Sequence, residues 1–88
     1  MKKYTFIAEF RGGTYISQYK AMTLMNALFI WADNLDPQYF TNRLKIKIQE
    51  KVRDEYFFPI SIETVDNVWC SSYVINKSFL LLNIIETV

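Results

Sequence analysis

The two glycines of this 88-residue chain stand side by side, as Gly12–Gly13, between two segments in which residue polarity alternates. Residues 4–11 and 14–19 each place aromatic or small side chains at every second position, which is typical of a strand with one buried face. A two-residue hairpin turn needs positive φ at both central positions, and glycine adopts such φ values without steric cost. The pair therefore predicts a β-hairpin that turns at Gly12–Gly13 and sets Phe10 opposite Tyr15.

A phosphate-binding loop is the functional alternative for the same two glycines. Dinucleotide-binding and P-loop motifs have further glycines, or a Gly-Lys-Ser/Thr ending, and they join a strand to a helix. Neither pattern follows Gly13, and a second strand-like segment comes next instead. The hairpin is the better interpretation of the pair.

A helix is predicted over residues 21–35, which contain neither glycine nor proline. Asp36–Pro37 ends it, because a residue before proline avoids the α region. Its apolar stripe is formed by Leu24, Leu28, Trp31 and Leu35. Phe29 and Ile30 make the apolar arc wider than a single contact with a sheet requires.

Residues 38–56 fit both a helix and a strand. Leu44, Ile46 and Ile48 alternate with lysines as in a strand. Apolar residues also recur at four-residue steps, and the segment is rich in good helix formers. We favour a helix here, and a strand over residues 43–53 is the alternative.

The last part of the chain predicts a second hairpin, with strands over residues 67–75 and 78–87 and a turn at Asn76–Lys77. Asparagine tolerates the positive φ that such a turn requires. One face of this hairpin carries Trp69, Tyr73, Leu80, Leu82 and Ile84. The other face carries Val68, Cys70, Val74, Phe79, Leu81 and Ile85. Both faces are apolar, whereas an antiparallel sheet with one side in water has a single apolar face.

These elements give the order β-β-α-α-β-β in a single small domain, residues 1–88. The fold class is α+β, with an antiparallel sheet of about four strands and two helices packed on one face. Residues 60–66 form either an ordered connection or a short edge strand, and the strand order in the sheet stays open. The opening β-β-α arrangement resembles the N-terminal half of HicB-type antitoxin domains. That likeness is one of arrangement, covers less than half of the chain and carries over no functional residue.

Histidine is absent and cysteine occurs once, at Cys70, which removes several kinds of chemistry. The usual general base, the commonest metal ligand and the Ser-His and Cys-His couples all need histidine. A single cysteine forms no disulfide framework and no cysteine-based metal cluster, and in mid-strand it is expected to be a buried structural residue. We expect no catalytic residue, no cofactor and no metal site.

The chain also lacks the segments that direct a protein to a membrane. The N-terminal residues include two lysines, but Thr5 and Glu9 interrupt any apolar run, unlike a signal peptide. The longest apolar runs, such as residues 79–82, are far shorter than the roughly 18 residues that a membrane span needs. We therefore expect a cytoplasmic protein without membrane contact.

Carboxylates are the remaining candidates for catalysis. Glu9 and Glu86 would form an acid–base pair, or a metal site with oxygen ligands, if the fold brought them together. Glu63 and Asp66 flank the connection before the last hairpin. Most Asp and Glu side chains of proteins lie exposed in water, so a carboxylate enzyme is the least favoured function.

Half of the ten basic residues lie within residues 43–53, against one acid, Glu50. They are Arg43, Lys45, Lys47, Lys51 and Arg53. On a helix such a strip can follow phosphates, so nucleic-acid binding is an alternative function. The net charge of +1 and the acids that follow at Asp54 and Glu55 favour an ordinary solvated helix face instead.

Apolar residues make up 51% of the chain and aromatic residues 17%, more than a small monomer hides easily. The leading hypothesis is therefore a non-enzymatic adaptor or regulatory domain that forms a homodimer through an apolar sheet or helix surface, burying about 800 Å² per subunit. The expected contact residues are Trp69, Tyr73, Leu80, Leu82, Ile84, Phe29 and Ile30. Another protein, or a small apolar ligand between sheet and helices, is the alternative cover.

Overall fold

The computed structural model describes residues 1–87 as a small α+β domain. Its elements are β1 (Lys2–Phe10), β2 (Gly13–Ala21), α1 (Leu24–Asp33), α2 (Asn42–Val52), a short 3-10 turn (η1, Glu55–Phe57), β3 (Ile60–Ser61), β4 (Val68–Ile75) and β5 (Ser78–Thr87). The expected order is therefore confirmed in outline. The addition is β3, a two-residue strand within the stretch that the sequence leaves open as a connection or an edge strand.

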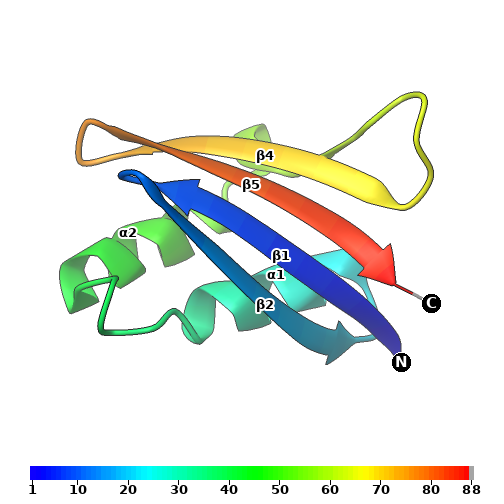
Figure 1. Ribbon diagram of the computed structural model, residues 1–88, viewed down its shortest axis with the longest axis horizontal. Helices are drawn as coiled ribbons and strands as arrows, with labels where there is room; N and C mark the ends of the chain where they lie inside the picture. The colour runs from blue at the N-terminus through cyan, green and yellow to red at the C-terminus, as the bar shows by residue number, and fades with distance from the viewer. Residues whose placement is uncertain (88) are drawn as a thin grey trace.

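The strands form one antiparallel sheet in the order β2-β1-β5-β4-β3. Figure 1 shows the first and last strands, β1 and β5, side by side at the centre of the sheet. The two hairpins therefore lie next to each other, joined by the pairing of the chain's two ends. This leaves β2 as one edge of the sheet and the very short β3 as the other.

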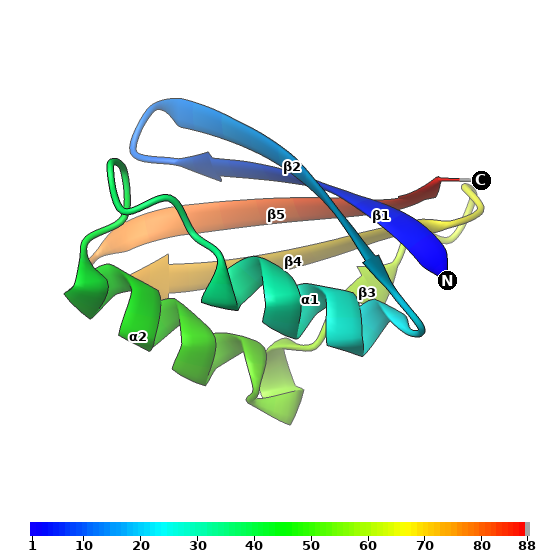
Figure 2. The same ribbon diagram turned by 90° about the horizontal axis from the view of Figure 1, so that it is seen from below.

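Both helices lie on the same face of the sheet, as expected from the sequence (Figure 2). α1 packs against β1 and β2, whereas α2 packs against α1 and β4. No element covers the opposite face in the part of the chain that the structure describes. Among residues 1–87 no helix is long and apolar enough to cross a membrane.

The first hairpin turns at Arg11–Gly12, one residue earlier than the glycine pair suggests. Arg11 and Gly12 have φ values of 50° and 81°, and the register sets Phe10 opposite Gly13 and Ala8 opposite Tyr15. Gly13 begins β2 beneath the Tyr15 ring: a Cβ at this position would lie 2.7 Å from Cζ of that ring, so a larger residue would require the ring to shift. The pairing differs from the expected one by two residues, so every side chain keeps its face.

The second hairpin is as expected. Asn76 and Lys77 have φ values of 49° and 67°, the left-handed conformations of a two-residue turn, and Ile75 pairs with Ser78. The alternation along both strands then places one set of side chains toward the helices and the other set away from them.

The two helices begin at capped residues. β2 runs on to Ala21, so α1 starts later than expected, at Leu24, where the Thr23 hydroxyl accepts a 3.1 Å hydrogen bond from the Asn26 amide. The ambiguous segment is a helix, α2, and Thr41 caps it in the same way. The apolar residues at four-residue steps form its buried face, because Leu44, Ile48 and Val52 pack into the core.

The core lies between the sheet and the helices. Trp31 of α1 stacks on Phe6 of β1 with ring centroids 5.8 Å apart, and Phe40 of the inter-helix loop stacks on Phe10 at the same distance. Tyr4, Phe6, Leu28, Ile48, Tyr73, Leu80, Leu82 and Ile84 are among the residues with 1% exposure or less. This packing occupies the helix-covered face of all four long strands.

Candidate protein-interaction surface

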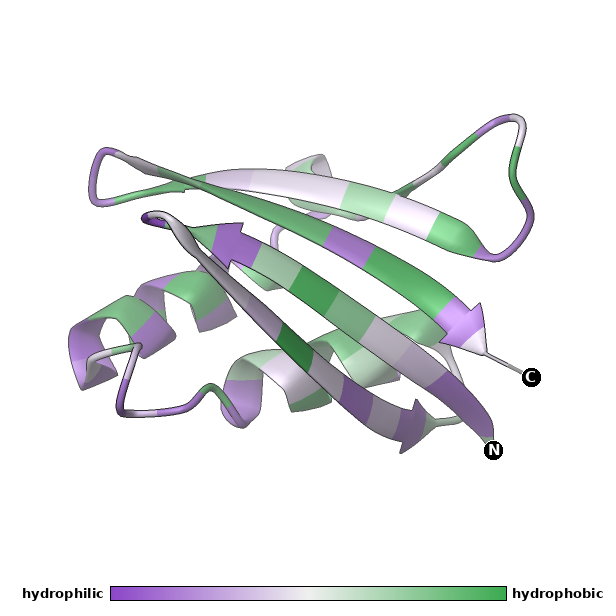
Figure 3. Cartoon of the chain, in the orientation of Figure 1, coloured by the Kyte–Doolittle hydropathy of each residue, from purple (hydrophilic) through white to green (hydrophobic). Residues whose placement is uncertain are grey.

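The uncovered side of the sheet, which we call the open face, carries many apolar side chains. Cross-strand register aligns Ile16, Ile7, Asn83, Cys70 and Ile60 in one row across all five strands. The adjacent rows contribute Val68, Ile85 and Leu81, and the row beyond Leu81 contributes Val74 and Phe79. Figure 3 views the sheet from this side and shows apolar positions along β1, β5 and β4. Several of these side chains are strongly exposed: Ile60 by 74%, Ile16 by 68%, and Val74 and Phe79 by 60% each.

Polar residues are gathered toward one end of the open face. Lys3 and Lys20 are cross-strand partners there, and in the next row Gln18 donates a 3.0 Å hydrogen bond to the Thr5 hydroxyl. Glu9 lies toward the other end, between Thr14 and Leu81. The ion pairs among residues 1–87 join Lys2 to Glu86 and Arg53 to Asp33, so none of the three charges on this face belongs to one.

The edge strand β2 presents unpaired backbone groups. In a two-residue hairpin the residues flanking the turn, here Phe10 and Gly13, form a hydrogen-bonded pair, and so does every second pair beyond them. The N–H and C=O groups of the intervening residues therefore point away from β1. On β2 these residues are Thr14, Ile16, Gln18 and Lys20.

Natural edge strands are usually short, bulged, interrupted by proline or rich in charge, which prevents pairing with another chain. β2 has none of these features. It pairs with β1 one to one over nine residues, it contains no proline, and its only charged residue is Lys20. The opposite edge of the sheet ends in the two residues of β3. β2 is thus an open template for a further strand.

A groove runs beside β2 on the helix side of the sheet. It has a volume of about 600 Å³, and its walls are β2, the C-terminal end of α1 and the loop that follows α1. Its lining includes Tyr15, Ser17, Tyr19, Trp31, Leu35, Asp36 and Tyr39. Tyr15 contacts the loop through Tyr39, with ring centroids 5.0 Å apart. Asp36 is the only charged residue among those that line the groove.

The loop that forms the outer wall is ordered by local hydrogen bonds. The Asp36 side chain accepts a 2.9 Å bond from the Gln38 amide, and its carbonyl accepts bonds from the Tyr39 and Phe40 amides. Phe40 then enters the core beneath Phe10, which anchors the loop to the sheet. The loop is therefore fixed by its own hydrogen bonds and by the Phe40 ring in the core, and this fixes the outer wall of the groove.

The structure places most of the contact residues expected from sequence on the covered face. Tyr73, Leu80, Leu82 and Ile84 have 1% exposure or less, and half-buried Trp69 packs near Tyr4 with ring centroids 6.3 Å apart. They form the floor of the core rather than an accessible surface. Since both faces of this hairpin are apolar, its sequence pattern does not distinguish the covered face from the open one.

Phe29 and Ile30 are half-buried side chains of α1 that pack against the edge of the core. The guanidinium of Arg53 lies 4.7 Å from the centroid of the Phe29 ring. The wide apolar arc of α1 is therefore covered in part by Arg53, the C-cap residue of α2, through a cation–π contact. These two residues contribute little accessible apolar surface.

The five basic residues of 43–53 do not form one continuous strip. Arg43, Lys47 and Lys51 lie one turn apart on one side of α2, as expected, but Lys45 and Arg53 lie toward the other side. Lys47 bonds the side chain of Asn76, and Lys51 lies 4.7 Å from the centroid of the Phe57 ring.

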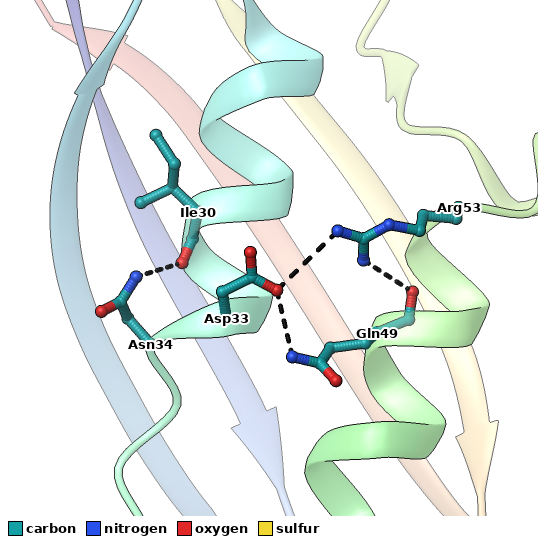
Figure 4. Close-up of polar contacts among 5 residues, drawn as sticks. All are labelled: Ile30, Asp33, Asn34, Gln49 and Arg53. Carbon is teal, nitrogen blue, oxygen red and sulfur yellow. Dashed lines mark hydrogen bonds and ion pairs between the residues drawn. The ribbon is translucent and has the colours of Figure 1, made fainter.

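Arg53 belongs to a polar junction between the two helices (Figure 4). Its guanidinium lies 3.8 Å from the Asp33 carboxylate and donates a 3.1 Å bond to the Gln49 carbonyl. The Gln49 side chain donates to the same Asp33 oxygen at 3.0 Å. Nearby, the Asn34 side chain donates to the Ile30 carbonyl and closes the end of α1. Three of the five basic side chains thus already have partners within the chain.

The carboxylates are dispersed. Glu86 pairs with Tyr4 in the sheet and lies near Lys2, whereas Glu9 lies at the other end of β1 and on the open face. Glu63 and Asp66 are exposed in the turn before β4. No group of three His, Cys, Asp or Glu residues within 1–87 is arranged to hold a metal ion. Cys70 was expected to be a buried structural residue, but it is half-buried on the open face, beside Asn83 and Ile60.

One buried polar group has no counterpart in the sequence analysis. The Tyr73 hydroxyl is buried without a hydrogen-bond partner among residues 1–87, and burial raises the pKa of this phenol. Burial, together with the nearby Glu86 carboxylate, also raises the pKa of Tyr4. The groove was missed for a different reason: it depends on how the loop after α1 folds back to β2, and local patterning carries no signal for that contact.

A scan against protein-family models found no match, and searches of curated proteins and of solved structures found none either.

Proposed function

We propose that this chain is a non-enzymatic protein-interaction domain that self-associates into a homodimer, and that the uncovered part of its sheet supplies the contact surface. The observation that carries the proposal is the uncovered side of the sheet, an apolar open face bordered by the unpaired edge strand β2. Soluble monomers rarely expose large contiguous apolar patches, and such patches usually mark interaction sites. Ile16, Val74 and Phe79 project from this face with at least 60% exposure.

The dimensions of the uncovered sheet suit a specific interface. Four strands of eight to ten residues, at about 3.3 Å per residue and about 4.8 Å between strands, give a face of roughly 30 × 20 Å. A stable interface buries about 800 Å² on each partner. The open face, the β2 edge and the groove together offer an area of that order.

The test is the mass of the protein in solution. Size-exclusion chromatography with light scattering at tens of micromolar should give twice the 10.5 kDa of a single chain. Circular dichroism on the same sample checks that the fold is intact. A mass of one chain across the whole concentration range, from a well-folded sample, would remove the homodimer from the proposal.

A further inference from the structure

We propose that two copies of this chain pair antiparallel through β2, with the two-fold axis at Ser17, so that each copy places Tyr19 into the groove of the other. This inference rests on the self-association proposed above and assigns the contact between copies to the β2 edge and the groove beside it, so that the open face stays uncovered in the dimer. The two five-stranded sheets become one continuous sheet, with all helices on the same side.

The backbone of β2 is complementary to itself in this register. With the axis at Ser17, Thr14 pairs with Lys20 of the second copy, and Ile16 pairs with Gln18 of the second copy. All four residues direct their N–H and C=O groups outward, and each such pair makes two hydrogen bonds. This register therefore forms about eight hydrogen bonds between the two copies and leaves none of the outward-pointing residues of β2 unpaired.

The neighbouring registers use the edge less completely. An axis at Ile16 brings Lys20 opposite Gly12, in the turn, so its outward groups have no strand partner. An axis at Gln18 leaves Thr14 unpaired in the same way. The position of Ser17, midway between Thr14 and Lys20, is the one that pairs every outward residue of β2.

The side chains on the helix side also match. Tyr15 comes to lie opposite Tyr19 of the second copy, and the two Ser17 side chains meet at the axis, where a small residue leaves room for close approach. The groove beside Tyr15 is lined by Tyr39 and Trp31. It receives an aromatic ring from the partner, and cross-strand aromatic pairs of this kind stabilise a sheet.

Charge supports a second copy as the occupant. In this register Lys20 of the second copy lies opposite Thr14, whose partner on β1 is Glu9, and all three side chains lie on the open face. Within residues 1–87 neither Glu9 nor Lys20 belongs to an ion pair. The two-fold axis repeats this arrangement, so Lys20 of each copy lies in the same cross-strand row as Glu9 of the other.

Cysteine cross-linking tests the register. In a Cys70→Ser background, single variants Ile16→Cys, Ser17→Cys and Gln18→Cys are oxidised mildly, with Ile46→Cys on the exposed side of α2 as the collision control. Residues facing each other at a non-hydrogen-bonded antiparallel position have Cα atoms about 4.5 Å apart, within the range of a disulfide. Ser17→Cys should therefore form covalent dimers fastest on a non-reducing gel.

The outcomes separate this inference from the proposed function. If light scattering shows a dimer but Ser17→Cys links no faster than Ile46→Cys, the β2 pairing is wrong while self-association stands. Faster linking of Ile16→Cys or Gln18→Cys would overturn the register. A monomer at every concentration would overturn the homodimer itself.

A second pair of variants tests the edge without a new cysteine. Gln18→Pro removes an outward N–H, and proline is tolerated on an edge strand where that N–H faces solvent. Gln18→Ala loses the same side-chain hydrogen bond to Thr5 but keeps the N–H. We expect Gln18→Pro to weaken dimerisation by about tenfold or more and Gln18→Ala to leave it nearly unchanged. Equal dimer affinity for the two variants, with both folded by circular dichroism, contradicts the pairing.

Discussion

The Tyr73 ring packs against the Phe57 ring with centroids 6.0 Å apart, and the Tyr73 hydroxyl is buried without a hydrogen-bond partner in residues 1–87. The Ser71 hydroxyl lies close enough to oppose the rise that burial causes in the pKa of this phenol. The nearby Ser71 hydroxyl donates instead to the Phe57 carbonyl, at 3.0 Å. At the contact between β4 and the η1 turn, the Ser71 hydroxyl therefore has a hydrogen-bond partner, whereas the Tyr73 hydroxyl is buried without one. Burying a polar group without a partner costs about 1–3 kcal/mol.

Replacing that hydroxyl should stabilise the fold. Tyr73→Phe keeps the ring that packs on Phe57 and removes the unpartnered oxygen, so the free energy of unfolding in urea should rise by about 1 kcal/mol. Tyr39→Phe is the matched control, because Tyr39 is 51% exposed and its hydroxyl is not buried. A clear loss of stability in Tyr73→Phe would show that the phenol has a partner in solution.

The raised pKa values of Tyr4 and Tyr73 predict how stability responds to alkali. Burial is the main cause of both shifts, and it favours the neutral phenol in the folded chain. In the unfolded chain the same phenols ionise near their ordinary pKa of about 10. Their contribution to stability is therefore complete below pH ~10 and is lost as the pH rises toward the folded-state values.

The measurement is a series of urea unfolding curves from pH 8 to pH 11. The free energy of unfolding should fall in the upper part of this range, and Tyr73→Phe should reduce the slope. An identical slope in wild type and variant would mean that Tyr73 does not titrate with unfolding.

Pairing through β2 joins two sheets edge to edge, so the open face stays uncovered in the proposed dimer and should bind apolar probes in the native state. Phe79→Ser and Val74→Thr remove side chains that are 60% exposed, so they should lower the fluorescence of a dye such as ANS and change stability by about 0.5–1 kcal/mol at most. Ile46→Thr is the control, since Ile46 is 47% exposed but lies on α2, away from the sheet. Unchanged dye fluorescence in both sheet variants would argue against an accessible apolar face.

The basic residues of α2 should not produce appreciable nucleic-acid binding. Lys47, Lys51 and Arg53 contact Asn76, Phe57 and Asp33 within the chain, and the strip is divided between two sides of the helix. We expect no retention on single- or double-stranded DNA at 150 mM salt, a condition chosen near physiological ionic strength. Retention that weakens with added salt, and that Arg43→Ala with Lys47→Ala abolishes, would restore the nucleic-acid hypothesis.

Local chemistry predicted much of the fold. The Asn76–Lys77 turn acts through neighbouring residues, and the four-residue step from Leu44 to Val52 reports a buried helix face. The end of the first helix was predicted less well, because α1 ends at Asp33, two residues before the predicted end at Leu35. The first turn lies at Arg11–Gly12, one residue before the glycine pair, and the Tyr15 ring lies over Gly13 at the start of β2. The glycine pair is evident in the sequence, whereas the position of the Tyr15 ring over Gly13 is not.

The candidate surface was harder to predict. Leu80 and Leu82 face the helices, whereas Phe79 and Leu81 face outward, yet the two sets are equally apolar in sequence. Only the docking of α1 and α2 decides which set is covered. The groove also depends on tertiary packing, because it forms only where the loop that follows α1 brings Tyr39 against Tyr15.

Hydrogen exchange at two protein concentrations tests the central claim most directly. The Ile16 and Gln18 amides point away from β1, whereas the Tyr15 and Ser17 amides are bonded to it and serve as internal references. The account predicts that exchange at Ile16 and Gln18 slows markedly from low micromolar to millimolar protein, while the two references stay slow throughout. Fast exchange at Ile16 and Gln18 that does not depend on concentration would contradict it.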